Sequence, residues 1–281
     1  MAEVRVVTDS AADLDRAVAA ERGIAIVDLD VRLGEVGPDV TKTWSPEEFW
    51  QHSVSSSVLP ETSAPSPGAF AATFEKAASE GASGVVCVTL SSKLSATYQA
   101  AVAGAEAVAD NIDVTVVDSL TVTMAEGLVV LAALEAARRG GDVGAVARTA
   151  ETVRTRTHVF GVLDTLDNLR KGGRIGGAQA FMGSLLSIKP VVEVRDGVVE
   201  AESRQRTRQR SFEYLVGKVR SAGSIARLAV VHAVAPDIEV FLDLLSETFP
   251  RDETDVGIVG PVIGTHCGPG TIGVCFELAA P

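Results

Sequence analysis

The chain has 281 residues, of which 46% are hydrophobic and 5% aromatic, and its formal net charge is −12 at pH 7. A net negative charge of this size repels nucleic-acid phosphates and anionic lipid headgroups, so we expect no nucleic-acid partner and no stable membrane insertion. The length exceeds that of a usual single hydrophobic core, which indicates two domains.

The first part of the chain alternates predicted strands and helices. Each of three units combines a valine-rich strand, a polar cluster and an apolar-faced helix. They are Val4–Val7 with a helix whose apolar face starts at Asp13–Leu14, Gly84–Leu90 with a helix at about 96–109, and Val114–Val117 with a helix through Ala137. This alternation predicts a parallel sheet with helices on both faces, and ligands bind at the carboxyl ends of the strands in such sheets.

The second part has a different pattern. A helix is predicted near 143–154, followed by strands at 159–162 and 188–194. Asp196-Gly197 stands between two valine-containing runs, which predicts a β-hairpin. We therefore expect an N-terminal α/β domain at 1–157 and a C-terminal domain with a mixed sheet at 158–281.

The cysteine pattern and the N-terminus indicate the compartment. Cys87, Cys267 and Cys275 are odd in number and lack metal-ligand spacing, which argues against a disulfide framework and a zinc site. The N-terminus opens directly into a strand, and the sequence has no long uncharged apolar run. We expect a soluble protein of the cytoplasm.

Hydroxyl and carboxylate side chains follow each of the three strands of the first part. The residues are Asp9, Ser10, Ser92, Ser95, Asp118 and Ser119. Each cluster by itself is explained as helix capping, because these oxygens accept hydrogen bonds from the first N–H groups of a helix. Together, hydroxyls and helix N-termini that converge on one sheet edge favour a site for a small anion.

Two further segments have restricted backbones. Gly257–Gly273 holds His266 among glycines and two prolines, so its imidazole points at one place. In the segment 61–68, Pro65 and Pro67 favour extended backbone and present Thr62 and Ser63 at a fixed angle, although an ordinary surface loop explains the same pattern.

Six motifs resemble the successive signatures of the DegV family. They are Thr8–Leu14, Thr62–Pro67, Ser91–Gln99, Leu169–Ile175, Ile188–Pro190 and Gly260–Gly270. Their order and spacing match from one end of the chain to the other. Two positions depart from the family pattern. Ala96 replaces a usual glycine, and Cys267 replaces a frequent threonine and is either a small apolar filler or a reactive thiol.

The resemblance implies a DegV-like α/β fold with a ligand between two domains, and a bacterial fatty-acid-binding protein similar to the FakB subunits of fatty acid kinase. Such a protein encloses one long-chain fatty acid and presents its carboxylate to a separate kinase subunit, which makes an acyl phosphate for phospholipid synthesis. It is not an enzyme and holds no metal or cofactor, because ATP and Mg²⁺ belong to the kinase. The implied carboxylate contacts are Thr62, Ser95 and His266, supported by Asp9, Ser10, Ser63, Ser92, Asp118, Ser119 and Thr265.

An apolar stripe and two basic clusters complete the expected site. The segment 178–188 carries an apolar stripe at helical spacing, formed by Phe181, Met182, Leu185, Leu186 and Ile188. This stripe is either the wall of an acyl tunnel or plain hydrophobic core. The basic residues would dock the kinase or its ATP phosphates, or form a solvated surface: Arg170, Lys171, Arg174 and the alternating Arg204, Arg206, Arg208 and Arg210. We allow only transient contact with a membrane surface during fatty acid exchange.

Two enzyme-like interpretations remain open. Ser95 or Ser92 would be the nucleophile of a serine hydrolase, with His266 as base and Asp9 or Asp118 orienting it, although the Gly-x-Ser-x-Gly elbow is missing. Alternatively, His266 would engage a carbonyl substrate, as in dihydroxyacetone kinases, which the broad fold group resembles.

Overall fold

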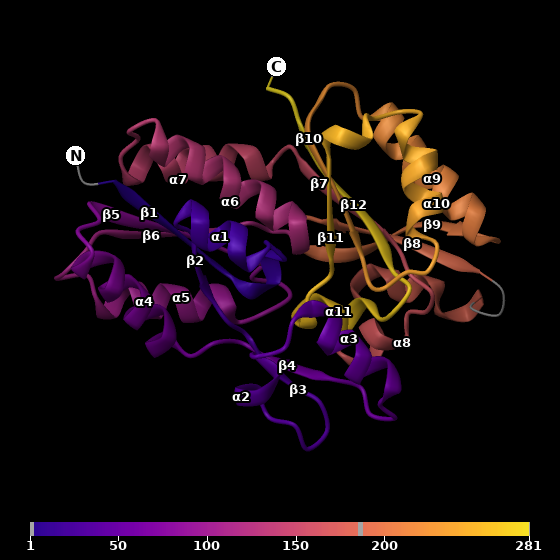
Figure 1. Cartoon of the computed structure of the whole chain (residues 1–281), viewed down its shortest axis with the longest axis horizontal. Coiled ribbons are helices and arrows are strands. Elements are labelled where there is room, and N and C mark those ends of the chain that lie inside the picture. The colour runs from indigo at the N-terminus through magenta and orange to yellow at the C-terminus, as the bar shows by residue number, and fades with distance from the viewer. Residues whose placement is uncertain (1–2, 185–187, 281) are drawn as a thin grey trace. The chain divides into compact units, whose positions relative to one another are not determined.

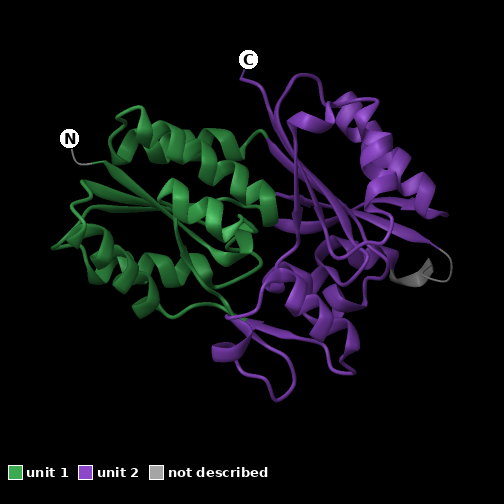
Figure 2. Cartoon of the chain, viewed as in Figure 1, with its two compact units in different colours: residues 1–30, 63–156 green, residues 31–62, 157–281 purple. Residues whose placement is uncertain are grey.

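The computed structural model describes residues 3–184 and 188–280. The chain forms two compact units, the first from residues 1–30 and 63–156 and the second from residues 31–62 and 157–281 (Figure 2). The predicted domain of residues 1–157 was therefore wrong for residues 31–62. They belong to the second unit because the Trp50 indole N–H donates to the Val259 carbonyl at 2.8 Å, which ties this segment to the C-terminal part of the chain.

The first unit contains a four-stranded parallel sheet in the order β2-β1-β5-β6. Helices cover both of its faces (Figure 1), which confirms the predicted α/β architecture. The strands are β1 (Val4–Asp9), β2 (Ala25–Val27), β5 (Gly84–Thr89) and β6 (Val114–Asp118), and the helices are α1 (Arg16–Arg22), α4 (Pro67–Ser79), α5 (Thr97–Ala107), α6 (Thr123–Arg138) and α7 (Val143–Arg154).

Alternation along the strands divides the core of the first unit. Val86 and Val88 of β5 join the cluster of α6 and α7, whereas Val85 and Cys87 join the cluster of α4 and α5. Successive side chains of a strand point to opposite faces of the sheet, so a strand that is covered on both faces is apolar at successive positions.

The first helix begins later than predicted. Ser10–Ala12 forms a short 3₁₀ turn, η1, and Asp13 after it has a left-handed backbone with φ of 51°. Helix α1 starts only at Arg16, where the Asp15 carboxylate accepts from the Val18 N–H. A left-handed residue interrupts the helical hydrogen-bond ladder, so the apolar pattern from Asp13 could not begin the helix.

The second unit contains a six-stranded mixed sheet in the order β11-β10-β12-β7-β8-β9. The β10–β11 pair is parallel, and the other pairs are antiparallel. Helices α9 (Arg208–Ser221) and α10 (Ile238–Ser246) pack on one core cluster of this sheet. The strands are β7 (Thr157–Val162), β8 (Lys189–Arg195), β9 (Val198–Gln205), β10 (Ile225–His232), β11 (Thr254–Ile258) and β12 (Ile272–Leu278).

The predicted hairpin is confirmed between β8 and β9. Asp196 and Gly197 have φ values of 49° and 84°, so both central residues are left-handed, as a type I′ turn requires. The shorter elements of the second unit are α2 (Pro38–Thr41), α3 (Pro46–Ser55), α8 (Asp167–Lys171), η2 (Gly176–Ser184), η3 (Arg251–Glu253) and α11 (Pro261–Cys267). Strands β3 (Asp30–Arg32) and β4 (Glu61–Ser63) pair where the chain leaves and re-enters the first unit.

The α-helical spacing predicted for 178–188 was wrong for residues 178–184. Residues 176–184 form the 3₁₀ helix η2, in which side chains repeat every three residues rather than at α-helical spacing. A Cβ at Gly176 would overlap the Val199 carbonyl oxygen, so η2 lies directly against β9. Leu185 and Leu186 of the predicted tunnel wall lie outside the described residues, as does the side chain of Met182.

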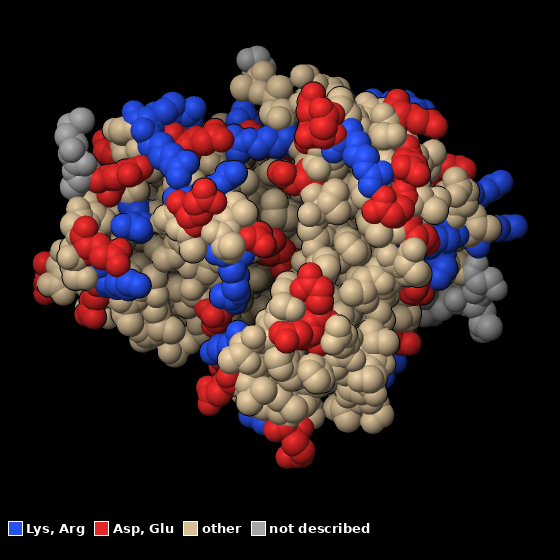
Figure 3. Space-filling view, in the orientation of Figure 1, with Lys and Arg blue, Asp and Glu red and all other residues tan. Residues whose placement is uncertain are grey.

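The surface carries charges of both signs. On the face drawn in Figure 3, acidic and basic side chains are interspersed over both units. Among the described residues, none of the helices has the length and hydropathy that crossing a bilayer requires.

Candidate functional site

Carboxylate and hydroxyl side chains lie in the turns at the carboxyl edge of the first unit's sheet. Asp9, at the end of β1, is fully buried and accepts from the Ala11 N–H at 2.9 Å and from the Leu90 N–H at 2.9 Å. Asp118, at the end of β6, accepts from the N–H groups of Ser92 and Leu120 at 3.1 and 3.0 Å. Both carboxylates therefore organise the turns that follow the strands.

The serines of this edge have local partners as well. The Ser95 hydroxyl lies 2.8 Å from that of Thr97 and accepts from the Thr97 N–H at 3.3 Å, at the start of α5. Ser10 accepts from the Leu29 N–H, and Ser119 accepts from the Thr121 N–H. Ser63 is exposed at the end of β4. A hydroxyl has one donor and two lone pairs, so Ser95 keeps capacity for a ligand while it stabilises the helix start.

A buried glutamate lies behind this edge. Glu126 of α6 is fully buried, and its Oε1 accepts from the Thr8 hydroxyl at 3.1 Å. Its Oε2 has no hydrogen-bond partner among the described residues. Burial, followed by the charge of Asp9, raises the pKa of Glu126 well above its usual value, and burial raises the pKa of Asp9 to about 7. Burial therefore favours the protonated form of Glu126 over the charged form.

We expect Glu126→Gln to stabilise the protein at alkaline pH. A raised pKa favours folding fully below the unfolded pKa, near 4.5, and this contribution is lost as the pH rises toward the folded pKa. Glutamine does not titrate, so its advantage over the wild type should be small at pH 5 and reach roughly 1–3 kcal/mol at pH 8. Urea unfolding at both values measures it. Glu106→Gln on the surface of α5 is the control, and parallel pH profiles for wild type and Glu126→Gln would contradict the assignment.

His266 of the second unit lies in the last turn of helix α11, not in a loop. Gly260 and Pro261 start this short helix, and Gly268 with φ of 76° follows its end. The His266 Nε2 lies 2.9 Å from the Thr62 Oγ1, although the two residues are 204 positions apart. The structure therefore brings two of the three implied carboxylate contacts together within one unit, whereas Ser95 belongs to the other unit.

The segment after α8 forms the seat of His266. A Cβ at Gly172 would lie 2.9 Å from the His266 Cε1 and closer still to Nδ1, so only glycine allows this approach. Arg174 donates to the Gly172 carbonyl at 2.6 Å. Burial of the ring, followed by the Arg174 charge, lowers the pKa of His266 from 6.5 to about 4. The imidazole is therefore neutral at physiological pH.

Helix α3 holds α11 and the Thr62 strand in one block. Gly264 of α11 leaves room for Trp50, whose Cζ2 would lie 2.6 Å from a Cβ at that position. Trp50 is 2% exposed, and α3 leads by a short connection into β4, which carries Thr62. The tryptophan therefore packs directly against the helix that carries His266, and it stands in the segment that leads to Thr62.

Thr265, predicted as a supporting ligand contact, has its hydroxyl engaged within α11. It donates to the Pro261 carbonyl at 2.8 Å, and the Thr265 carbonyl accepts from the buried Asn168 amide at 3.1 Å. Asn168, Gly172 and Trp50 were not among the predicted site residues. Gly172 stood in a motif that we interpreted as a docking surface, and one of only two tryptophans in the chain was an available signal for Trp50.

The four alternating arginines at 204–210 do not belong to one extended segment. Strand β9 ends at Gln205, and helix α9 begins at Arg208 with Thr207 as its cap, so the alternation crosses two kinds of structure. Arg204 donates to the Ala180 carbonyl at 2.7 Å and lies over the Phe181 ring at 4.8 Å. Arg206 is exposed, as are Arg170 and Lys171 at the end of α8, whereas Arg174 is half-buried. Phe181 is buried and Ile188 is half-buried.

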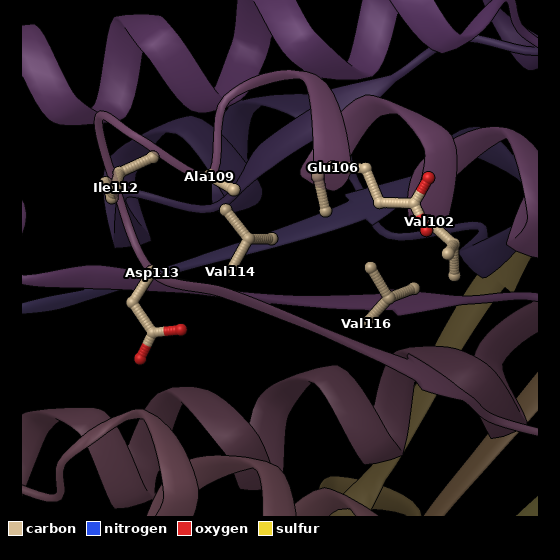
Figure 4. A pocket seen from close by; sticks show the side chains of 8 residues that line it. Val102, Glu106, Ala109, Ile112, Asp113, Val114 and Val116 are labelled. Atoms are coloured by element: carbon tan, nitrogen blue, oxygen red, sulfur yellow. The ribbon is translucent and has the colours of Figure 1, made fainter.

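A groove of about 300 Å³ lies between α5 and the edge strand β6 (Figure 4). Its wall is aliphatic apart from Glu106 and Asp113, so it offers no hydroxyl or imidazole donor and carries negative charge. Such a groove is unsuited to a carboxylate ligand, and it contains none of the predicted site residues. No group of three His, Cys, Asp or Glu side chains placed to hold a metal occurs among the described residues.

The chain is an α/β protein of two units, one with a parallel sheet and one with a mixed sheet. The mixed-sheet unit holds a neutral histidine, His266, within hydrogen-bond distance of Thr62. The model of the DegV family, described as uncharacterised, matches residues 3–279. A DegV domain-containing protein of Streptomyces coelicolor is 37% identical over 275 residues, covering 96% of this chain and 97% of the relative. The chain belongs to the DegV family, as its motifs predicted.

Solved structures of DegV family proteins are similar to this chain over its whole length. A DegV family protein from Thermus thermophilus, described by its fatty acid binding, has a TM-score of 0.86 at 32% identity, covering 99% of this chain and 100% of that one. DegV from Bacillus subtilis, described as a fatty acid binding protein, has a TM-score of 0.85 at 29% identity with the same coverage.

Proposed function

We propose that this protein binds one long-chain fatty acid and holds its carboxylate through Thr62, Ser95 and His266. The observation that supports this most is the neutral, buried His266 within 2.9 Å of the Thr62 hydroxyl, in a chain similar over its full length to proteins described as fatty acid binding. Neutral donors suit an anion that enters and leaves, because they add no permanent buried cation.

The proton of the imidazole is expected on Nε2. The His266 Nδ1 is buried without a hydrogen-bond partner among the described residues, and a proton there would be a buried donor without an acceptor. With the proton on Nε2, the ring donates to the Thr62 oxygen. The Thr62 hydroxyl hydrogen can then donate to a carboxylate oxygen, so His266 acts on the carboxylate through the hydroxyl donor that it orients.

The expected energies are sufficient for tight binding. Each buried methylene contributes about 0.8 kcal/mol, so a palmitate-sized tail gains on the order of 12 kcal/mol before ordering costs. Desolvation of the carboxylate costs several kcal/mol unless hydrogen bonds replace water. A few well-placed donors are therefore enough to orient the acid, while the tail supplies the affinity.

Several observations favour a binding protein over a serine hydrolase. Both oxygens of Asp9 accept backbone N–H groups, and one oxygen of Asp118 accepts two, so both carboxylates have structural roles. A pKa of about 4 makes His266 a weak general base. Labelling of Ser92 or Ser95 by a fluorophosphonate would contradict this preference.

The finer role is presentation of the bound carboxylate to a separate ATP-dependent kinase, which makes an acyl phosphate for phospholipid synthesis. The exposed Arg170, Lys171 and Arg206 are suited to contact the acidic surface or phosphates of such a partner. ATP and Mg²⁺ would then be bound by the kinase. A cytoplasmic protein with transient membrane-surface contact fits this role.

We expect protein purified from a bacterial host to carry a fatty acid, and Thr62→Val, Ser95→Ala and His266→Gln each to weaken palmitate binding by about 1–3 kcal/mol. Denaturing extraction with mass spectrometry identifies the ligand, and calorimetry on delipidated protein measures the affinity. His52→Gln, at an exposed histidine of α3, is the matched control. An empty, folded protein that also binds neither palmitate nor oleate would exclude the proposed function.

A further inference from the structure

Arg208, predicted as a docking residue, has only 19% of its side chain exposed. Its Nε and Nη2 donate to the two carboxylate oxygens of Asp237, both at 2.9 Å. The hydrogen bond and charge of Arg208 lower the pKa of Asp237. Arg208 is thus held in a two-pronged ion pair rather than presented to solvent.

The same guanidinium contacts the turn that follows the His266 helix. Its Nη2 also donates to the Gly270 carbonyl at 2.6 Å, and its Nη1 lies 3.4 Å from the Asp164 Oδ1. Gly270 has φ of 78°, and a Cβ there would overlap the Asp164 Oδ2. The turn is therefore confined between an arginine on one element and a carboxylate on another.

Further bonds transmit this restraint to α11. The Thr271 hydroxyl donates to the Cys267 carbonyl at 3.0 Å, and the Gly268 N–H donates to the Gly264 carbonyl at 3.0 Å. The Gly270 N–H donates to the Ala233 carbonyl at 2.8 Å, in the loop that leads to Asp237. Cys267 is the neighbour of His266, so a shift of this turn moves the end of the helix that carries the imidazole.

The opposite wall of the turn is fixed as well. Asp164 follows β7 by two residues, and its Oδ1 accepts from the Lys189 ammonium at 2.7 Å, at the start of β8. Asp164 is thereby tied to the central strands of the sheet. Arg208 and Asp164 together hold the turn against a rigid base.

We propose that Arg208 is a positioning residue for His266: by binding Asp237 and the Gly270 carbonyl together, it sets the end of α11 and hence the Thr62–His266 pair. This inference rests on the proposed function only for its effect on the ligand. Lysine cannot replace arginine here, because one ammonium cannot span a carboxylate and a carbonyl in the fixed fork of a guanidinium.

The test compares Arg208→Lys and Arg208→Gln with Arg210→Gln, an exposed arginine in the same first turn of α9. Ring nitrogen and carbon shifts of His266 are recorded by NMR in delipidated protein, and the dissociation constant of palmitate is measured for each variant. Both Arg208 variants are expected to shift the His266 ring signals and weaken binding roughly tenfold or more, with Arg210→Gln like wild type.

Unchanged His266 signals in a folded Arg208→Lys or Arg208→Gln protein would overturn the proposal, and so would equal effects of Arg210→Gln. A lower melting temperature with unchanged ring signals would also overturn it, since that is a merely structural effect. If wild-type protein binds no fatty acid, the proposed function fails, but the ring signals of the unliganded protein still decide the role of Arg208.

Discussion

Gly172→Ala is expected to reduce fatty acid binding by roughly 10- to 100-fold, because the new methyl group occupies the place of the His266 ring. A Cβ at this position would lie 2.9 Å from the His266 Cε1, nearer still to Nδ1, and 3.1 Å from the Asn168 carbonyl oxygen. Displacement of the ring breaks its contact with the Thr62 hydroxyl at 2.9 Å. The overall stability should fall by only about 1–3 kcal/mol, the usual cost of overpacking.

Gly217→Ala is the matched control for this substitution. Gly217 lies within helix α9 of the same unit, and a Cβ there meets no atom within 4 Å. Alanine in an open helix interior stabilises by up to about 1 kcal/mol, so binding should stay normal and the melting temperature should rise slightly. Titration of delipidated protein with palmitate compares the two variants. If Gly172→Ala bound palmitate with wild-type affinity, His266 would not be part of the carboxylate site.

Trp50→Ala is expected to lower the free energy of unfolding by about 3–5 kcal/mol, the largest stability effect at a single position that we predict. The side chain is 2% exposed, and its indole N–H donates to the Val259 carbonyl at 2.8 Å. Alanine leaves a cavity under α11 and an unpaired carbonyl. Trp50→Phe fills most of the cavity but leaves the carbonyl unpaired, so its loss should be smaller, at about 1–3 kcal/mol.

Trp44→Ala provides the comparison at the other tryptophan. Trp44 is half-buried and stacks on His52 with ring centroids 4.3 Å apart, so its loss should cost well under half as much as the loss of Trp50. Urea unfolding measures both, and fatty acid titration should show a defect for Trp50→Ala alone. Equal costs at the two positions would mean that residues 31–62 do not support the His266 helix.

The regular elements could be predicted because their signals are local. Continuous apolar runs such as Val85–Val88 mark strands buried on both faces, and Asp196-Gly197 is suited to the two left-handed residues of a type I′ turn. The location of polar residues at the ends of these strands could also be predicted, because they directly follow the apolar runs in the sequence. The start of the first helix was predicted wrongly because Asp13 has a left-handed backbone, and the apolar pattern contains no sign of that conformation.

The motifs alone identified the family and the residue types of the candidate site. Thr62 and His266 were both named as candidate contacts, and the chemistry of a hydroxyl and an imidazole follows from the side chains themselves. Their contact, however, joins residues 204 positions apart, and it depends on Trp50 packing residues 31–62 against α11. No local pattern contains that information, so the predicted domain boundary missed this segment.

The tertiary structure also decided what the glycines and arginines do. Gly172 is required by the His266 ring beside it, and Arg208 binds Asp237 and Gly270 instead of facing solvent. A sequence specifies that a residue is small or cationic, but its burial and partners are set by elements that arrive from distant parts of the chain. The low pKa of His266, at about 4, is likewise a property of that burial and of Arg174, and not of the histidine alone.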